Sequence, residues 1–241
     1  HGKAEIGNER ERMGRIDAER REHREDLGVE FLLQPLLVVL ADRAGADDED
    51  ILACHILLQN GQGSLLLLEG EPGVGKSRLM AEARRLRPDD TLRWLEGRSL
   101  SFRRQLSYWP FIQLLKASFH ITEDDGEQTA WGKLEQGLRP LFGERTPEVL
   151  PYLATVLALP IPPAHEERLK YLDGIGLRRQ VFLCFRQLIE GLSQRQPLVL
   201  CLEDWHWADQ SSVDLADHLL ALTTTLPLLL VFAARPQPDS P

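Results

Sequence analysis

The sequence predicts an α/β fold in which a parallel β-sheet is flanked by helices. Three apolar runs, at residues 64–69, 198–202 and 228–232, are short and nearly continuous, which is typical of strands buried on both faces. A further strand is expected at residues 91–96, after a turn at 88–90. Because helix-prone segments separate these strands, right-handed crossovers and parallel pairing are favoured.

The segment after the first of these strands carries a phosphate-binding motif. Residues 70–77 read Gly-Glu-Pro-Gly-Val-Gly-Lys-Ser, and a helix-prone stretch follows at 78–83, which is the context that the motif requires. Its three glycines permit positive φ, so backbone N–H groups can close on phosphate oxygens beside the positive end of the helix. We expect Lys76 to reach the β- and γ-phosphates and Ser77 to hold Mg²⁺. The expected phosphate-binding residues are Gly70, Glu71, Pro72, Gly73, Val74, Gly75, Lys76, Ser77 and Arg78.

Two carboxylates, Glu203 and Asp204, directly follow the predicted strand at 198–202. Open α/β sheets bind ligands at the carboxyl ends of their strands. One carboxylate could hold Mg²⁺ through its waters, because that ion prefers octahedral oxygen coordination, and the other could orient or deprotonate an attacking water. In isolation the pair would read as an acidic turn. Together with Lys76 and Ser77 it favours a site for nucleotide hydrolysis.

The order of the motifs favours ATP as the nucleotide. The predicted strand at 91–96 lies between the two motif strands in the sequence, and we expect it to separate them in the sheet as well. Such an inserted strand typifies ATPases with an acidic water-activating residue. A GTPase would show Asn-Lys-x-Asp after a later strand, and a small-molecule kinase would lack the acidic pair. ATP and Mg²⁺ are therefore the expected ligands.

Residues 105–195 are expected to form a largely helical insertion between the second strand and the strand of the acidic pair. Pro110 is a helix-start signal, because proline suits the first turn of a helix. The prolines at 160–163 predict a linker within the insertion. Further along the chain, a serine at position 211 or 212 is expected to cap a helix that begins at Val213.

Composition and charge argue against a nucleic-acid or membrane partner. The 241-residue chain carries a net charge of −9, which does not favour a dedicated nucleic-acid surface. Three cysteines in apolar surroundings, without Cys-x-x-Cys spacing, indicate buried thiols in a reducing compartment and neither disulfides nor zinc; they are Cys54, Cys184 and Cys201. The apolar stretch from Phe31 to Ala41 is too short to span a bilayer, and the region before it is too acidic and too long for a signal peptide. A cytoplasmic location is expected.

The stretch at residues 198–212 carries a family resemblance. It reads Leu-Val-Leu-Cys-Leu-Glu-Asp-Trp-His-Trp-Ala-Asp-Gln-Ser-Ser and closely resembles the signature of STAND-class predicted ATPases within the AAA+ superfamily. It is especially similar to the ATPase domain that follows class III adenylate/guanylate cyclase domains and precedes helical repeats in large bacterial signalling proteins. Residues 106–111 and 150–153 resemble that group too. The resemblance covers about residues 60–241 and implies a P-loop NTPase fold of the AAA+ (ASCE-like) kind.

This resemblance implies roles for individual residues. Lys76 and Ser77 match the phosphate and magnesium residues of the family. Glu203 and Asp204 match its magnesium-coordinating and catalytic acids. Arg235, just beyond the last predicted strand, matches the arginine with which such proteins sense the γ-phosphate, although an exposed loop arginine is the alternative. His206, Trp207 and Asp209 match three further positions of the signature. Their side chains could pack in the fold, make contacts that change with the nucleotide state, or take part in the chemistry.

Two departures from the family concern the ends of the sequence. Residues 1–59 read as a charged, helical N-terminal segment ahead of an ATPase core at 60–241. The family's Val-Gly-Arg-Glu motif, which lines the adenine pocket, is resembled only by Ile6 to Glu9, where asparagine replaces the arginine and residues 17–50 would be an insertion. The sequence also ends before the family's fifth strand and helical lid, so it is expected to be a fragment truncated before the lid.

The leading hypothesis is a Mg²⁺-dependent ATPase module that cleaves the β–γ phosphoanhydride bond slowly, as a switch within a larger signalling protein. Its partners would be ATP and ADP, a cyclase domain and helical repeats. A non-hydrolysing nucleotide-binding scaffold is the first alternative, since switching requires differential affinity for two states and not turnover. A DNA-associated AAA+ ATPase is the second, and the acidic charge counts against it.

Overall fold

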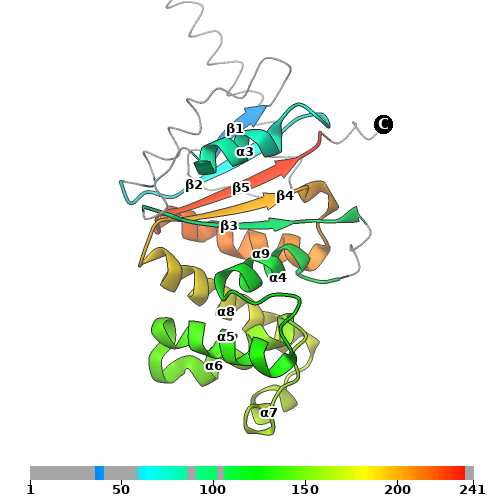
Figure 1. The fold of residues 1–241 in the computed structure, drawn as a ribbon, viewed down its shortest axis with the longest axis vertical. Helices are drawn as coiled ribbons and strands as arrows, with labels where there is room; N and C mark the ends of the chain where they lie inside the picture. Colours follow the sequence, from blue (N-terminus) through cyan, green and yellow to red (C-terminus); the bar gives the residue numbers. More distant parts are fainter. Residues whose placement is uncertain (1–35, 41–57, 59, 86–90, 102–105, 237–241) are drawn as a thin grey trace, which may run out of the picture.

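The structure is a computed structural model that describes residues 36–40, 58, 60–85, 91–101 and 106–236. The described strands form one five-stranded parallel sheet in the order β1-β2-β5-β4-β3 (Figure 1). The strands are β1 (Leu36–Leu40), β2 (Ser64–Glu69), β3 (Arg93–Arg98), β4 (Leu198–Glu203) and β5 (Leu228–Ala234). The α/β fold with a parallel sheet that the sequence predicts is therefore confirmed.

The order of the strands corrects one expectation. β5 lies between β2 and β4, and β3 pairs with β4 alone among the described strands. The prediction that the strand near residues 91–96 would separate the two motif strands was therefore wrong. The reason is visible in the burial of the strands: all but the last residue of β5 are buried, whereas β3 alternates between buried and exposed positions at its end. A fully apolar strand suits the middle of a sheet, and an amphipathic strand suits its edge.

β1 is a strand that the sequence analysis did not predict. It pairs in parallel with β2, with Leu36 opposite Leu65. Its sequence, Leu-Leu-Val-Val-Leu, is a short apolar run with two β-branched residues, which is a strand signal. β1 lies upstream of the domain boundary expected at residue 60, and that boundary stays a prediction.

The helical insertion is confirmed. Its described residues include the α-helices α4 (Trp109–Ser118), α5 (Glu127–Phe142), α6 (Thr146–Val156), α7 (Pro163–Lys170) and α8 (Gly174–Ser193), with the 3₁₀ turn η2 (Gly143–Arg145) between α5 and α6. Elsewhere in the described residues, the helices include α3 (Lys76–Arg85), α9 (Gln210–Leu220) and the 3₁₀ turns η3 (Trp205–Trp207) and η4 (Ala221–Thr224). The expected linker at 160–163 ends one residue early, because Pro163 begins α7.

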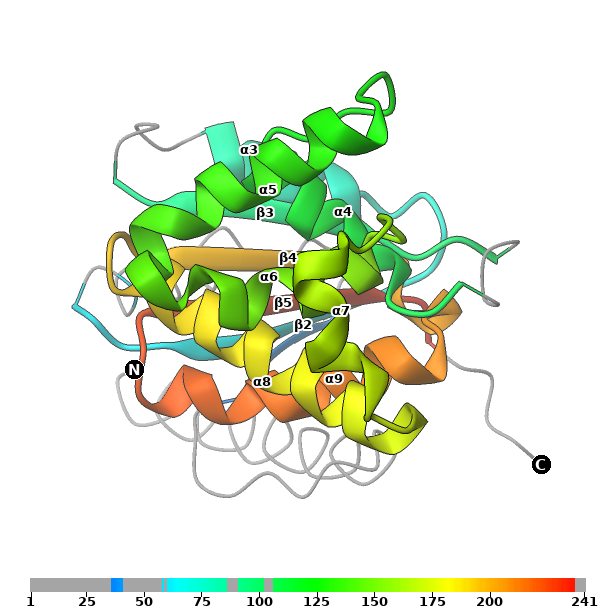
Figure 2. The ribbon, with the colours of Figure 1, turned by 90° about the horizontal axis from the view of Figure 1, so that it is seen from below.

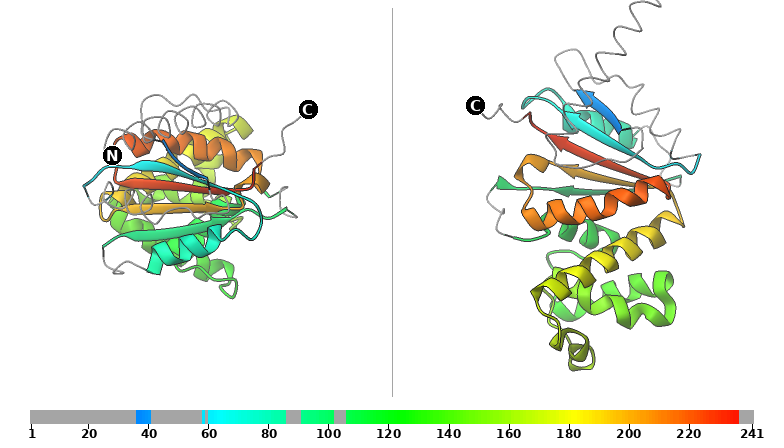
Figure 3. Two further views of the ribbon diagram at one scale, coloured as in Figure 1. Left: turned by 90° about the horizontal axis from the view of Figure 1, so that it is seen from above. Right: turned by 180° about the vertical axis from the view of Figure 1, so that it is seen from behind.

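In the described residues, a hydrophobic core packs on each face of the sheet. Along β4, Leu198, Leu200 and Leu202 face one core, whereas Val199 and Cys201 face the other, as the two-residue period of a strand requires. The first core is completed by residues of α4, α5, α6, α8 and α9, and the second by α3. Seen from behind, α9 lies in front of the sheet and α3 behind it (Figure 3, right), and α5 and α6 extend the first core into an outer layer (Figure 2).

The cysteines that the structure describes agree with the expectation of buried thiols. Cys184 and Cys201 are free and buried, and burial raises the pKa of the Cys184 thiol to about 12. Burial also raises the pKa of Cys201, with a smaller contribution from the nearby carboxylates of Glu203 and Glu96. Cys54 lies outside the described residues. Within the described part of the chain, no helix has the length and apolar character needed to cross a bilayer.

Candidate nucleotide-binding site

The phosphate loop joins β2 to α3. β2 ends at Glu69 and α3 begins at Lys76, so the loop sits between a buried strand and a helix N-terminus, as the sequence predicts. Gly73 (φ 84°) and Gly75 (φ 104°) adopt left-handed backbone conformations, which side chains rarely tolerate, whereas Gly70 does not. The loop therefore needs glycine at its second and third glycine positions to make its turn.

Lys76 lies folded against its own loop. Its ammonium group donates hydrogen bonds to the backbone carbonyls of Gly70 and Glu71, the latter at 3.1 Å. Partial burial lowers the pKa of Lys76, and the positive charge of Arg235 lowers it further, while the Asp204 carboxylate acts in the opposite direction. The charges of Arg235 and Asp204 therefore act on this lysine although both residues follow other strands.

The phosphate loop and the acidic pair meet in the fold. The Ser77 hydroxyl, at the start of α3, donates a hydrogen bond of 3.3 Å to Oε2 of Glu203 at the end of β4. The two residues are 126 positions apart in the sequence. Asp204 follows in a left-handed conformation (φ 51°), a strained geometry for a residue other than glycine that tends to occur at functional sites.

One edge of the sheet collects the candidate residues because every strand is parallel. The carboxyl end of β2 leads into the phosphate loop, that of β4 into Asp204, and that of β5 into the exposed Arg235. β5 lies between β2 and β4, so Arg235 emerges between the loop and the acids. The arrowheads of β3, β4 and β5 lie toward the right in Figure 1. Ligands of open α/β sheets bind at this edge.

Arg98 is a residue at this edge that the sequence analysis missed. It ends β3, where the sheet register places it opposite Glu203. Its guanidinium donates to Oε2 of Glu203, from Nε at 3.1 Å and from Nη2, and its Nε lies 3.4 Å from Oδ2 of Asp204. The hydrogen bond to Glu203 raises the pKa of Arg98. The signal in the sequence was an arginine two residues after the predicted end of that strand.

The family assignment follows from a comparison with protein-family models. The model described as "AAA ATPase domain" matches residues 35–231, which is most of the chain. The chain belongs to the AAA ATPase domain family. The match begins just before β1 and ends within β5, so it includes the phosphate loop, the helical insertion and the acidic pair.

A search of curated proteins found a relative of this AAA ATPase domain in Rhizobium meliloti (strain 1021). That relative is described as an uncharacterized protein. The two are 28% identical over 180 residues, which cover 73% of this chain and 16% of the relative. The chain thus spans about a sixth of the length of that protein.

The signature stretch after the acids is built into the AAA ATPase domain as a packed turn. Trp205, the first residue of η3, packs edge-on against Phe232 of β5, with ring centroids 4.9 Å apart. The rings of His206 and Trp207 are 5.0 Å apart. The backbone N–H of Trp207 donates to the carbonyl of Asp204 at 2.9 Å, so this turn fixes the backbone that carries the second acid.

Asp209 caps α9, which corrects the expectation that Ser211 or Ser212 would cap a helix beginning at Val213. The helix begins at Gln210, and Asp209 accepts hydrogen bonds from the backbone N–H and the hydroxyl of Ser212 at 2.9 and 2.6 Å. The same buried carboxylate accepts the backbone N–H of Tyr108 at 3.2 Å. Asp209 therefore ties the start of α9 to the start of α4.

The described residues hold no cluster of three or more His, Cys, Asp or Glu side chains that could bind a metal alone. A magnesium ion at this edge would therefore need oxygen ligands from the nucleotide and from water as well as from the protein. The expected motif at Ile6 to Glu9 lies outside the described residues. Of the expected insertion at 17–50, the structure describes only residues 36–40, which form β1 of the sheet.

Proposed function

We propose that this AAA ATPase domain binds Mg·ATP and hydrolyses it slowly as a regulatory switch. The observation that carries the proposal is the 3.3 Å hydrogen bond between Ser77 Oγ and Glu203 Oε2. It joins a phosphate loop to the acid of a second strand, and nucleotide hydrolysis requires both in one place. Phosphates would lie along residues 70–78, against the backbone N–H groups of the loop and the N-terminus of α3.

Ser77 and Glu203 suit a magnesium ion. Their oxygen atoms are 3.3 Å apart, close to the separation of about 3 Å between neighbouring ligands of an octahedral ion with bonds of about 2.1 Å. A hydroxyl and a carboxylate are also the hard oxygen ligands that this ion prefers. Bound Mg²⁺ would neutralise charge on the β- and γ-phosphates. Because Glu203 also pairs with Arg98, the carboxylate would have to exchange one cationic partner for another.

Asp204 is our candidate for activating water. In this proposal the water oxygen attacks the γ-phosphorus, Asp204 accepts the proton, and the bond from the γ-phosphorus to the bridging oxygen breaks to release phosphate and ADP. Lys76 and Arg235 would offset the charge that develops on the phosphoryl oxygens. The charge of Arg235 lowers the pKa of Lys76, which supports this proposal because it indicates that the two cations lie near each other.

The wider role is proposed from the resemblance to cyclase-associated ATPases. The chain matches only 16% of its relative from Rhizobium meliloti, which supports a module within a larger protein. We infer that nucleotide state is passed to neighbouring domains, including a cyclase domain and helical repeats, within a signalling protein of the STAND class.

Nucleotide titration and turnover of matched variants test the function. Labelled ATP and GTP are titrated into the purified protein with and without Mg²⁺, and phosphate release is then measured. We expect Mg²⁺-dependent binding of ATP, loss of binding in Lys76→Ala, and a fall in turnover on the order of a hundredfold in Asp204→Ala. The exposed residues Lys170 and Asp217, changed to alanine, are the matched controls. Normal ATP binding by Lys76→Ala would refute the site, and unchanged turnover in Asp204→Ala would refute the assigned base.

A nucleotide-binding scaffold without turnover is the second candidate. The observation that favours it is the pairing of Arg98 with both acids, since it engages the two carboxylates that hydrolysis needs. ADP and ATP would then exchange without cleavage, and the two states would differ in their affinity for partner domains. Phosphate release with Mg²⁺ above that of Asp204→Ala excludes this candidate, whereas binding of ATP without such release supports it.

A further inference from the structure

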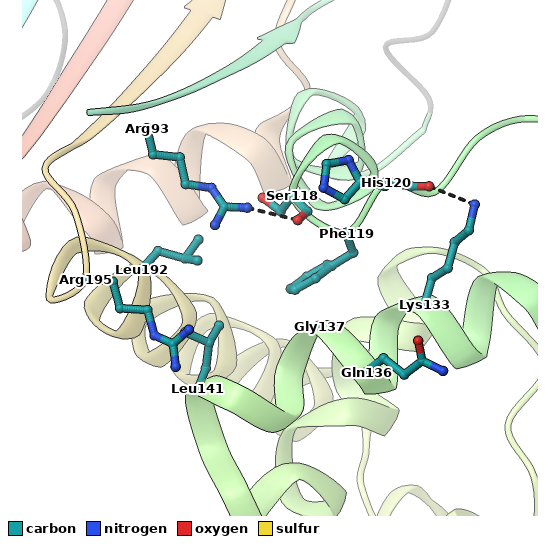
Figure 4. A pocket seen from close by; sticks show the side chains of 10 residues that line it. All are labelled: Arg93, Ser118, Phe119, His120, Lys133, Gln136, Gly137, Leu141, Leu192 and Arg195. Carbon is teal, nitrogen blue, oxygen red and sulfur yellow. Dashed lines mark hydrogen bonds between the residues drawn. The ribbon is translucent and has the colours of Figure 1, made fainter. Parts of the chain in front are cut away.

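A cavity lies at the opposite edge of the sheet from the phosphate loop. Its volume is about 450 Å³, and it is lined by the first residue of β3, the end of α4, the middle of α5 and the end of α8 (Figure 4). β3 runs from Arg93, which lines this cavity, to Arg98 at the candidate nucleotide site. Five residue steps along a strand span about 17 Å. The cavity is therefore separate from the site described above.

Positive charge dominates the lining. Three of the ten lining residues are arginine or lysine, and none is aspartate or glutamate. Asp125, which does not line the cavity, neutralises Lys133 through hydrogen bonds of 2.6 and 2.8 Å. Within the described part of the chain, Arg93 and Arg195 pair with no carboxylate. Two arginine charges on the cavity wall thus lack a counter-ion among the described residues.

Each of the two arginines contacts one backbone carbonyl and keeps further N–H groups available for a ligand. Arg93 donates from Nη2 to the carbonyl of Ser118 at 2.9 Å, and Arg195 donates from Nη2 to the carbonyl of Pro140. Each guanidinium has five N–H donors, so one carbonyl contact leaves most of the fork available. Burial lowers the pKa of Arg93, and the charge of Arg195 lowers it further. An anion between these groups would relieve that unfavourable electrostatic interaction.

Part of the remaining wall is apolar. Phe119 packs on the backbone of α5 at Gly137, where a Cβ would lie only 2.1 Å from the phenylalanine ring. Leu192 is buried beside it. His120 adopts a left-handed conformation (φ 54°), and its carbonyl accepts a hydrogen bond of 2.9 Å from Lys133. Small-molecule sites have volumes of about 300–1,000 Å³ and combine apolar contacts with a small number of placed polar groups, and this lining offers both kinds of contact.

We propose that this cavity binds a small organic oxyanion whose phosphate or carboxylate group lies between Arg93 and Arg195. The planar guanidinium fork binds either group through two parallel hydrogen bonds. The body of the ligand lies against Phe119 and Leu192. Gln136, on the exposed rim of α5, adds an amide that can donate a further hydrogen bond.

The test uses two aromatic probes that differ in the anionic group. Phenyl phosphate and benzoate are each titrated into the Lys76→Ala protein, so that the phosphate loop does not respond. Binding is followed by calorimetry and by the NMR signals of the arginine Nε–H groups. Arg195→Gln removes one cation from the cavity, and Gln136→Glu adds a negative charge to its rim. The matched controls lie outside the lining: Arg179→Gln on α8 and Gln128→Glu on α5, both exposed.

We expect one or both probes to shift the signals of Arg93 and Arg195, with affinity falling about tenfold or more in both cavity variants. The control variants should bind as the Lys76→Ala parent does, and added salt should weaken binding. The preferred probe then identifies the anionic group. The proposal is overturned if neither probe binds, if the controls weaken binding as much as the cavity variants do, or if an acidic peptide binds where both small anions fail. None of these results depends on whether the phosphate loop hydrolyses ATP.

Discussion

Arg98 and Glu203 stand opposite each other at the ends of β3 and β4, and the guanidinium of Arg98 donates to the carboxylate of Glu203. The carboxylate is only 14% exposed, whereas the arginine is 51% exposed. Gln113 of α4 braces the arginine backbone by donating to its carbonyl at 3.1 Å and accepting from its N–H at 3.0 Å. β3 therefore places the positive charge of Arg98 beside Glu203, our proposed magnesium ligand, and Asp204, our proposed base for the attacking water.

Removing that charge should ease the binding of magnesium. In Arg98→Ala the two carboxylates lose their cationic neighbour, so we expect the Mg²⁺ concentration needed for half-maximal ATP binding to fall about two- to fivefold, the range of an exposed ion pair. Titration of Mg²⁺ at fixed ATP measures this. The control is Arg84→Ala, which breaks an exposed ion pair with Glu96 away from the acids. An unchanged or higher Mg²⁺ requirement in Arg98→Ala would show that the arginine does not compete with the ion.

Asp209 is expected to stabilise the fold. Asp209→Ala removes the cap of α9 and leaves two N–H groups and a hydroxyl without their acceptor, so the free energy of unfolding should fall by about 2–3 kcal/mol. Urea denaturation measures this change. Asp173→Ala is the matched control, since Asp173 caps α8 through a single bond from the Gly176 N–H on an exposed surface and should cost about 1 kcal/mol. Equal losses for the two caps would contradict the tie between α9 and α4.

Gly97 allows β3 and α4 to approach each other. A Cβ there would lie 2.4 Å from the carbonyl oxygen of Pro110, a backbone atom that cannot move aside alone. Gly97→Ala should therefore destabilise the protein by about 2 kcal/mol or more. Gly132→Ala, in the interior of α5 where a Cβ meets open space, should instead stabilise it by about 0.5–1 kcal/mol. Thermal denaturation compares the two, and a neutral Gly97→Ala would refute the close contact.

The buried thiols should resist alkylation until the protein unfolds. In a Cys54→Ser variant, Cys184 and Cys201 remain, and burial raises the pKa of both. The pKa of the Cys184 thiol is about 12 in the folded protein and 9.0 for a free thiol. Burial of the neutral thiol therefore contributes fully to the free energy of unfolding below about pH 9. This contribution declines as the pH rises from 9 toward 12, because the thiol then ionises in the unfolded state but not in the folded state. Iodoacetamide at pH 8 should label neither thiol in the native state and both in urea. Rapid native labelling would contradict their burial.

The pattern of local sequence explains which parts of the site could be predicted. The phosphate loop depends on glycines in a short stretch, and its conformation follows from their freedom at positive φ, as Gly73 and Gly75 show. β4 and β5 are apolar runs that signal buried strands wherever they lie in the sheet. The acids could be assigned to the same edge as the loop because parallel strands end together.

Strand order and side-chain partners could not be predicted in this way. An apolar run indicates that a strand is buried, but it does not indicate which strands lie beside it. The sequence therefore could not show that β5, and not β3, lies between the two motif strands. Arg98 carries no motif, and its role appears only when β3 pairs with β4. The cap of α9 was misassigned because three candidate residues, Asp209, Ser211 and Ser212, stand close together and the geometry of the turn selects among them.

The sequence by itself determined that this chain forms a parallel α/β sheet with a phosphate loop on one strand and an acidic pair on another, because short-range backbone preferences and burial patterns specify those elements. Only the tertiary structure decided that Ser77 touches Glu203, that Arg98 pairs with both acids, and that two arginines line a cavity at the far edge. Those contacts join residues far apart in the sequence, and their geometry depends on the order in which the whole chain packs its strands.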